Sequence, residues 1–238
     1  MIMDMRLVGL IPLLPLLAAA LIGLRILLGR DRGDHAEPAT AWLALGAALA
    51  ALASLVAIDA SALAEGVPGT VTLGTWFTSG TLAIPLSFML DGLSLPVATL
   101  VALIASVTLR FSTFYLHREP GFHRFFLAMS LFLAGMLLIV LAGNAVLAFV
   151  GWELAGVSSW MLIGYVYERT TATVNAQRAF LTNRIGDAGF LLGIGLAVLW
   201  SGSVAWEDLA AWRPDTLLAG LLLLGFMVAA LAKSAQVP

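Results

Sequence analysis

An acidic and a basic side chain lie inside two stretches of this sequence that are apolar enough to cross a membrane. Glu153 lies in LAFVGWELAGVSSWMLIGY, and Lys233, the only lysine of the chain, lies in LLAGLLLLGFMVAALAKSAQVP. An ionisable side chain at the centre of a bilayer costs about 2.5–3.5 kcal/mol even on lenient insertion scales, and it usually faces a bundle interior or a wet cavity. A buried acid and a buried base on two different helices therefore predict an ion or proton path.

The composition indicates a membrane protein. Hydrophobic residues make up 61% of the chain and charged residues 11%, whereas ordinary soluble domains carry about 25% charged residues. Charge-free runs such as Gly92–Leu109 and Phe125–Trp152 match the roughly 20 apolar residues that a membrane-crossing helix needs. We therefore expect an all-α polytopic membrane protein. Because the sequence has no cysteine, disulfides and iron–sulfur ligation are excluded for these residues.

Hydropathy and turn residues predict about seven transmembrane helices, the last of them discontinuous. The expected spans are Leu7–Leu28, Ala41–Leu63, Phe88–Phe111, Phe125–Leu141, Ala145–Tyr167, Arg178–Trp200 and Thr216 to the C-terminus. Gly143 and Asn144 are expected to separate the fourth span from the fifth, because both residues favour turns. The segment Glu65–Pro85 alternates Val, Thr and Leu between Gly-Thr and Ser-Gly turns, which predicts a short hairpin lying on one surface.

The positions of the arginines predict the orientation in the membrane. If the N-terminus is outside and the spans alternate, nine arginines, Arg178 and Arg184 among them, fall at cytoplasmic ends, whereas Arg6 and Arg213 fall outside. The positive-inside rule favours this orientation over its inverse, and it makes the predicted hairpin periplasmic. Four tryptophans are expected at the same outer surface: Trp76, Trp200, Trp206 and Trp212. Trp152 and Trp160 lie too deep for that belt and are expected to pack in the bundle.

Three charged residues on the fifth and sixth spans add to the predicted path. Glu153 is eight residues past Ala145, which places it about 12 Å into the membrane. The alternative interpretation is that the Glu153 carboxyl stays protonated and is hydrogen-bonded to neighbouring backbone, to Ser158 or to Ser159. Arg184 and Asp187 are spaced i, i+3 on one helix face, so they can neutralise each other. A purely structural pair near the inner surface remains the alternative for these two residues.

The backbone around Lys233 predicts a broken helix. Pro238 lacks an N–H and clashes with the carbonyl four residues back, at Ser234, so the segment is a poor continuous helix. Transporters use such breaks at membrane depth as ion sites. A nearby carboxylate favours the charged form of a buried lysine, so movement of Glu153 toward or away from Lys233 would change whether the lysine holds its proton. A structural salt bridge is the alternative.

Five motifs occur in order toward the end of the chain. They are LDGLS at Leu90–Ser94, RFF at Arg124–Phe126, GWELAGVSSWMLIGY from Gly151, AFLTNRIGDAGFLLGI at Ala179–Ile194, and AKSAQVP from Ala232. With these motifs the chain resembles the antiporter-like subunit L (mitochondrial chain 5) of NADH-quinone oxidoreductase, complex I. The resemblance implies that Glu153 and Lys233 form the proton-translocating pair and that Arg184 and Asp187 modulate it. The sequence departs from the family at three positions: Trp160 replaces a frequent Tyr, Ala232 a Gly, and Arg178 a Lys.

The resemblance also implies a domain organisation and a setting. Residues 1–87 are expected to form an N-terminal two-helix region with the outer hairpin, and residues 88–238 the start of the proton-translocating domain. Family members continue through a second, inverted repeat and a long lateral helix, so the chain is expected to be an N-terminal fragment with a truncated first repeat. The implied partners are other membrane-arm subunits of a complex I-like assembly, the lipid bilayer and protons. The implied location is the bacterial inner membrane.

Two further classes of function remain open beside proton translocation coupled to quinone reduction elsewhere in a complex. The first is a subunit of a multi-subunit cation/proton antiporter of the Mrp type, or of a proton-coupled inorganic-carbon pump. The second is a purely structural membrane scaffold. The sequence contains no GxGxxG, Walker or metal-ligand pattern, and its three histidines (His35, His117 and His123) are expected in loops without suitable companions. We therefore expect no cofactor, no metal, no nucleic-acid partner and no redox chemistry in this chain.

Overall fold

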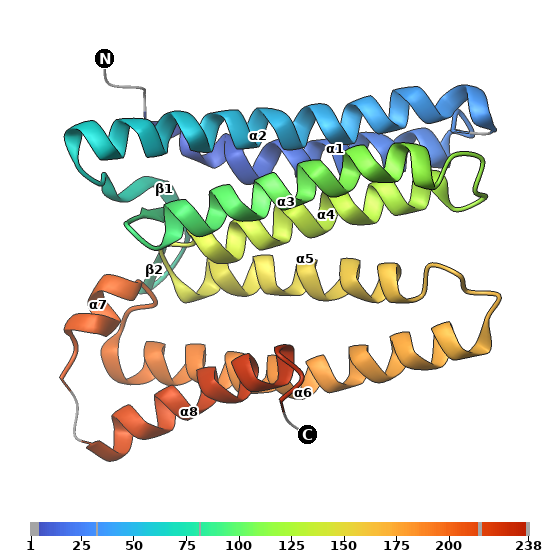
Figure 1. Ribbon diagram of the computed structural model, residues 1–238. Helices are drawn as coiled ribbons and strands as arrows, with labels where there is room; N and C mark the ends of the chain where they lie inside the picture. Colours follow the sequence, from blue (N-terminus) through green and yellow to red (C-terminus); the bar gives the residue numbers. More distant parts are fainter. Residues whose placement is uncertain (1–4, 32, 81, 214–215, 237–238) are drawn as a thin grey trace.

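The computed structural model describes residues 5–31, 33–80, 82–213 and 216–236 and shows long helices running alongside one another (Figure 1). The helices are α1 (Leu10–Leu27), α2 (Glu37–Glu65), α3 (Ser94–Tyr115), α4 (Phe122–Leu141), α5 (Ala145–Ile163), α6 (Thr170–Ser201), α7 (Trp206–Ala211) and α8 (Thr216–Lys233). Short 3-10 turns at Met5–Gly9 and Asp34–Ala36 precede α1 and α2. The strands β1 (Gly69–Ser79) and β2 (Leu82–Leu90) form one antiparallel hairpin.

The expected polytopic membrane fold is confirmed. Within the described residues, six helices are long and apolar enough to cross a membrane, and these are α1 to α6. The seventh expected span corresponds to α8, a shorter apolar helix. This helix ends at Lys233, where the sequence predicts a break, and the following backbone turns out of helical geometry with a positive φ of 55° at Ala235. Val237 and Pro238 lie outside the described residues.

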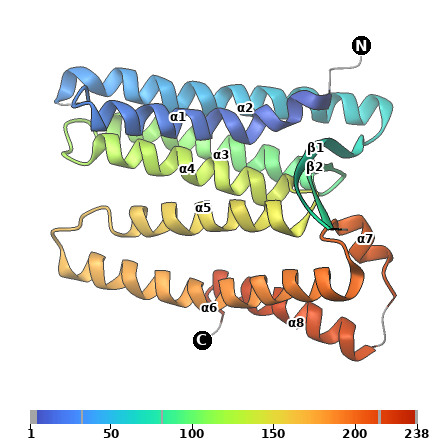
Figure 2. The same ribbon diagram turned by 180° about the vertical axis from the view of Figure 1, so that it is seen from behind.

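Two pairs of helices pack so closely that their backbones touch at glycines. Between α4 and α5, a Cβ added to Gly151 would lie 2.7 Å from the carbonyl oxygen of Gly135. Between α6 and α8, a Cβ added to Gly225 would lie 2.8 Å from the carbonyl oxygen of Gly189. Small residues permit this approach between helices in a membrane. Both views show α5 between the α1–α4 group and the α6–α8 pair, with α8 ending beside the middle of α6 (Figures 1 and 2).

The predicted break between the fourth and fifth spans is confirmed at Gly143-Asn144. Asn144 caps α5, because its Oδ1 accepts a hydrogen bond of 2.9 Å from the Leu147 N–H. Its Nδ2 donates to the carbonyl of Pro85 in β2 at 2.7 Å, and the Gly143 N–H donates to the Ser87 carbonyl at 2.9 Å. The break is therefore tied to the hairpin, which satisfies backbone groups that a helix end would otherwise leave unpaired.

The hairpin is confirmed but begins and ends further along the chain than predicted, at Gly69 and Leu90. Phe88 and Leu90, which the sequence assigns to the third span, pair instead with Val71 and Gly69 of β1. The third helix begins only at Ser94, because Asp91 provides its start: the Asp91 Oδ1 accepts from the backbone N–H of Ser94 at 2.7 Å and from that of Leu93 at 2.9 Å. These hydrogen bonds, first that from Ser94, hold the pKa of Asp91 below its usual range.

The loops divide between the two ends of the bundle as the alternating topology requires. The α1–α2, α3–α4 and α5–α6 connections share one end, and the hairpin and α7 share the other (Figure 1). The assignment of Arg184 to a helix end is wrong, because α6 begins at Thr170 rather than at Arg178. Arg184 therefore lies about 21 Å along the helix, at the depth of Glu153. We call the end with the other arginines the arginine-rich end.

We predict that the arginine-rich end faces the cytoplasm, which two single cysteines can test. The chain has no cysteine of its own, so Glu119→Cys in the α3–α4 loop and Ala210→Cys in α7 each introduce one reactive site. Both positions are exposed. A membrane-impermeant maleimide should label Ala210→Cys from the periplasm and Glu119→Cys only in inverted vesicles. Labelling of both from the same side would contradict the topology.

Candidate functional site

Glu153 sits midway along α5 and is held by Arg184 of α6. The Arg184 Nη1 donates to the Glu153 Oε1 at 3.0 Å, and its Nη2 donates to the Oε2 at 2.6 Å. Two parallel charge-assisted hydrogen bonds of this kind are among the strongest that side chains form. The alternative partner Ser158 instead donates to the carbonyls of Leu154 and Ala155 in its own helix. The carboxyl of Glu153 is therefore engaged in an ion pair between two helices.

Asp187 extends this ion pair along α6. Its Oδ2 lies 3.3 Å from the Arg184 Nη1, so the predicted i, i+3 pair is present. The pair does not lie near the inner surface as the alternative interpretation had it, because Arg184 is at mid-helix and reaches α5 as well. Asp187 is buried, and its other oxygen accepts a hydrogen bond of 2.8 Å from the indole Nε1–H of Trp152. Both carboxylate oxygens of Asp187 are thus occupied.

Lys233 enters the same region from α8 but does not reach Glu153. Its Nζ donates to the backbone carbonyl of Trp152 at 3.4 Å and lies 5.1 Å from the centroid of the Trp152 ring. Among the described residues, no carboxylate oxygen lies within 4.0 Å of this Nζ. The direct Glu153–Lys233 contact implied by the resemblance is therefore missing. The planar guanidinium of Arg184 fits a carboxylate with two hydrogen bonds, which an ammonium cannot match.

Trp152 is the residue that the sequence interpretation undervalued. It does pack in the bundle as expected, with its ring edge-on to Phe190 at 5.2 Å between centroids. It also joins Asp187 through its N–H and Lys233 through its ring and carbonyl. One signal was available in the sequence, since an indole N–H at membrane depth requires an acceptor.

A continuous charge network results from these contacts, and it joins three helices. In order, its members are Glu153, Arg184, Asp187, Trp152 and Lys233. With all four ionisable groups charged, two carboxylates balance two cations, which lowers the cost of placing them in a membrane. Arg184 keeps its charge at any physiological pH, whereas the two carboxyls and the lysine can gain or lose protons. The network can therefore hold a proton in more than one place.

Two of the histidines have polar partners, and His123 lies in the first turn of α4 rather than in a loop as expected. At the arginine-rich end, the Nδ1 of His117 lies 2.6 Å from the Glu37 Oε2. The Nδ1 of His123 is hydrogen-bonded to Thr40 at 2.8 Å and lies 3.9 Å from a carboxylate oxygen of the fully buried Asp31 side chain. These contacts join the α1–α2 connection to the α3–α4 connection. Within the described part of the chain, no group of three or more His, Asp or Glu residues could hold a metal ion.

The fold and the charge network define a polytopic membrane protein with a network of charged side chains between its helices, and family comparisons agree with this class. Residues 76–126 match the model of the N-terminus of NADH-ubiquinone oxidoreductase (complex I) chain 5. Residues 142–238 match the transmembrane model of NADH:quinone oxidoreductase and Mrp antiporters. This matched range contains every residue of the charge network.

Curated relatives carry the same names. The chain is 38% identical over 166 residues to NADH-quinone oxidoreductase subunit L of Mycobacterium tuberculosis, covering 69% of this chain and 26% of the relative. It is 36% identical over 171 residues to NADH-ubiquinone oxidoreductase chain 5 of Candida albicans, covering 71% of this chain and 31% of the relative. The match thus spans between about a quarter and a third of the length of these relatives.

Two solved structures share the fold. A chain of the Mrp complex from Dietzia sp. DQ12-45-1b matches with a TM-score of 0.70 at 24% identity, covering 93% of this chain and 23% of that chain. A chain of the membrane-bound sulfane sulfur reductase, an archaeal respiratory membrane complex, matches with a TM-score of 0.73 at 21% identity, covering 94% and 33%. The protein belongs to the family of antiporter-like membrane subunits that includes subunit L and chain 5 of NADH-quinone oxidoreductase.

We predict that Glu153 is coupled in stability to Arg184 more strongly than to Lys233. Removing one partner of an ion pair leaves the other charge uncompensated, so Glu153→Gln and Arg184→Gln should each destabilise the protein by about 2 kcal/mol, less than for a fully buried pair. The double variant should lose much less than the sum. The stability losses of Glu153→Gln and Lys233→Met should be closer to additive in their double variant. Each pair forms a double-mutant cycle, and its coupling free energy can be measured by denaturation in detergent. A Glu153–Lys233 coupling as large as the Glu153–Arg184 coupling would show that Lys233 contacts Glu153 directly.

A second prediction isolates the indole N–H of Trp152. Trp152→Phe keeps an aromatic ring beside Lys233 but removes the donor to Asp187, so a loss of about 1.5–3 kcal/mol is expected for a hydrogen bond to a charged group. Combining it with Asp187→Asn should cost less than the two single losses together. Trp160→Phe is the matched control, because no hydrogen-bond acceptor for that indole is found in the described residues; it should change stability little. An additive Trp152/Asp187 double variant would argue against the contact.

Proposed function

We propose that this chain is part of a membrane-arm proton-translocating subunit of NADH-quinone oxidoreductase and that the charge network carries the protons. The observation that carries the proposal is the contact path from Glu153 through Arg184 and Asp187, and then through Trp152, to Lys233 on α8. The names of the curated relatives support the type of complex. Quinone reduction would occur in other subunits, because these residues offer no redox group.

In this proposal Arg184 is the fixed charge for which two carboxylates compete. It holds Glu153 with two hydrogen bonds, the shorter of 2.6 Å, and Asp187 at 3.3 Å. A proton arriving on Glu153 removes its negative charge and weakens the two hydrogen bonds from Arg184, which together we call the fork. Arg184 then gains more from Asp187, since an ion pair outweighs a hydrogen bond to a neutral carboxyl in a poorly solvated site. Protonation of one carboxyl is thereby transmitted to the other.

Lys233 is the mobile cation in this scheme. Among the described residues its Nζ makes one hydrogen bond, of 3.4 Å, and this bond and its position over the Trp152 ring bind it less tightly than two hydrogen bonds bind Arg184. A lysine that moves between an aromatic face and a carboxylate experiences different stabilisation of its charged form at each place. Trp152 would act as its resting position, and the charge of Asp187 behind the indole would set how firmly the lysine stays there.

A cation/proton antiporter of the Mrp type is the second candidate. The family model that contains the charge network is described for both NADH:quinone oxidoreductases and Mrp antiporters, and the Mrp complex of Dietzia shares the fold. The chemistry proposed for the charge network would serve either assembly. What would differ is the partner that moves the charges: a quinone-reducing arm in one case and a counter-transported cation in the other.

The organisation of the chain follows from the same proposal. Residues 1–87 would be a peripheral two-helix region with the hairpin, and residues 88–238 the start of the translocating domain, in contact with other membrane-arm subunits. The bacterial inner membrane is the proposed location, supported by subunit L relatives in Mycobacterium tuberculosis and Neisseria meningitidis.

The test is Glu153→Gln in the intact assembly that contains this chain. The amide keeps the shape of the side chain and removes its charge, so the complex should assemble and proton pumping per NADH oxidised should be largely lost. Glu153→Asp, which stays titratable, should retain part of the pumping. Glu168→Gln, in the exposed α5–α6 connection, is the control and should pump normally. Normal pumping by Glu153→Gln would refute the proposed relay, and proton movement that requires external Na⁺ would favour the antiporter.

A further inference from the structure

The ammonium group of Lys233 lies against a buried glycine of α5. A Cβ added to Gly156 would lie 3.2 Å from the Lys233 Nζ, and apart from neighbouring parts of α5 no other atom of the described residues comes within 4 Å of that position. Gly156 follows Trp152 by four residues, and the Trp152 carbonyl accepts the hydrogen bond of 3.4 Å from the same Nζ. The missing side chain of Gly156 therefore provides the space in which the ammonium reaches the backbone of α5.

Gly156 differs in this respect from Gly151, which precedes it in α5. A Cβ added to Gly151 would meet the backbone of α4, 2.7 Å from the carbonyl oxygen of Gly135, so Gly151 serves the packing of two helices. Around Gly156 the described residues offer no such contact with another backbone, only the end of one flexible side chain. Because glycine costs helix stability relative to alanine, its presence at position 156 calls for a reason other than helix packing, and the contact that it permits is the one with Lys233.

The backbone end of the Lys233 side chain is held by helix packing. A Cβ added to Gly186 of α6 would lie 2.8 Å from the Cβ of Ala232, which is buried. Helix α8 thus lies directly against α6 at the residue before Lys233. A change in the position of the charge therefore requires rotation of the lysine side chain rather than movement of α8.

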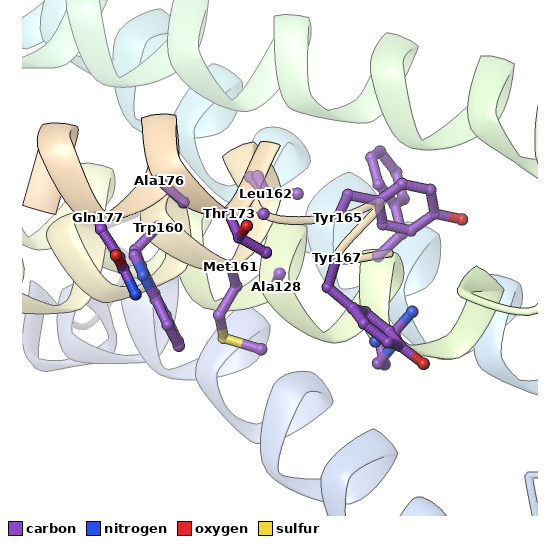
Figure 3. Close-up of a pocket in the computed structure, with 12 residues that line it drawn as sticks. Ala128, Trp160, Met161, Leu162, Tyr165, Tyr167, Thr173, Ala176 and Gln177 are labelled. Carbon is purple, nitrogen blue, oxygen red and sulfur yellow. The ribbon is translucent and has the colours of Figure 1, made fainter. Parts of the chain in front are cut away.

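Gly156 adjoins both groups of α5 that can accept a hydrogen bond from the ammonium. Residues three and four apart are neighbours on a helix surface, so Gly156 adjoins Glu153 as well as Trp152. Trp160, four residues further toward the arginine-rich end, lines a separate cavity of about 300 Å³, and Figure 3 shows it there with Gln177, opposite Tyr165 and Tyr167. No member of the charge network lines that cavity, so it is not the space that Lys233 occupies.

We propose that Gly156 is the positioning residue of Lys233: because it has no side chain, the ammonium can bind the Trp152 carbonyl and has room to turn toward Glu153. The inference rests on the function proposed above for the charge network. A methyl group at position 156 would displace the Nζ, since 3.2 Å is shorter than the separation of about 3.5–4.0 Å at which non-bonded carbon atoms pack. It would also place beside the charge an apolar group that offers no hydrogen bond.

Gly156→Ala tests the proposal because it should preserve the fold. Alanine is the better helix former, and the group that the new methyl meets can move aside, so the melting temperature of the full chain in detergent should be at least that of the wild type. Gly151→Ala should lower it, because there the methyl meets a backbone. Gly195→Ala in α6 is the matched control: no atom of the described residues lies within 4 Å of its added Cβ, so it changes helix propensity alone.

The position of the lysine can be measured directly, because Lys233 is the only lysine of the chain. The full chain labelled with ¹³C-lysine gives one set of lysine NMR signals, which the ring current of Trp152, 5.1 Å from the Nζ, makes sensitive to position. Gly156→Ala should move these signals, and Gly195→Ala should leave them in place. In the intact assembly, Gly156→Ala should lower proton pumping per NADH oxidised about tenfold, as for the loss of one hydrogen bond to a charged group, and should displace the pH dependence of pumping. Gly195→Ala should pump normally.

Three outcomes would overturn the proposal. Unmoved lysine signals in Gly156→Ala would show that the ammonium does not depend on the gap. A melting temperature lowered as far as in Gly151→Ala would show that Gly156 serves helix packing instead. Moved signals with normal pumping and an unchanged pH dependence would show that the position of the lysine has no part in translocation. If Glu153→Gln abolishes pumping, each of these results leaves the proposed function standing, whereas normal pumping by Glu153→Gln refutes that function whatever the lysine signals show.

Discussion

The two-bonded fork between Arg184 and Glu153 is the contact on which the arrangement of charges depends. An arginine cannot discard its charge, so its position midway along α6 requires a carboxylate partner in reach. Asp187 provides one such partner on the same helix, and Glu153 provides the second because α5 is oriented with that side chain facing α6. That orientation also brings Trp152, the next residue around α5, against Asp187 and beneath Lys233. One ion pair thus fixes where the other charges meet.

Close packing on either side keeps the fork in register. Glycine contacts hold α5 against α4 at Gly135 and Gly151, and α8 against α6 at Gly189 and Gly225. At the end opposite the arginine-rich end, Asn144 and Gly143 tie the start of α5 to the hairpin, and the Trp206 indole donates to the Ala142 carbonyl at 2.9 Å. These bonds satisfy the backbone where α4 ends and α5 begins, as a membrane protein must. The contacts at the start of α5 therefore fix the position of Glu153 along the axis of the bundle.

The sequence predicts those features that depend on local patterns and fails where helix orientation decides. Apolar runs locate the spans, Gly143-Asn144 locates the break, and the i, i+3 spacing anticipates the contact of Arg184 with Asp187. The start of α6 was missed because the polar segment TTATVNAQ carries the helix beyond the apolar run. Because of that error, Arg184 was grouped with the arginines at the ends of the helices. The choice of Arg184 rather than Lys233 as the partner of Glu153 depends on how α5, α6 and α8 rotate against one another, which no linear spacing reveals.

The use of the two basic residue types gives the charge network its chemical asymmetry. Every cation of the chain except Lys233 is an arginine, and the arginine in the network is the one held by two hydrogen bonds. Arginine suits that place because its charge is permanent and its planar fork matches a carboxylate. The lysine occupies the place with the loosest contacts, one hydrogen bond of 3.4 Å and an aromatic face. Because an ammonium can release its proton when it is poorly solvated, the one cation of the network able to change its charge is also the one with the weaker contacts. A fixed charge between two carboxylates and a titratable, loosely held charge beyond one of them form an arrangement in which, under the proposed relay, the arrival of a proton changes which ions pair.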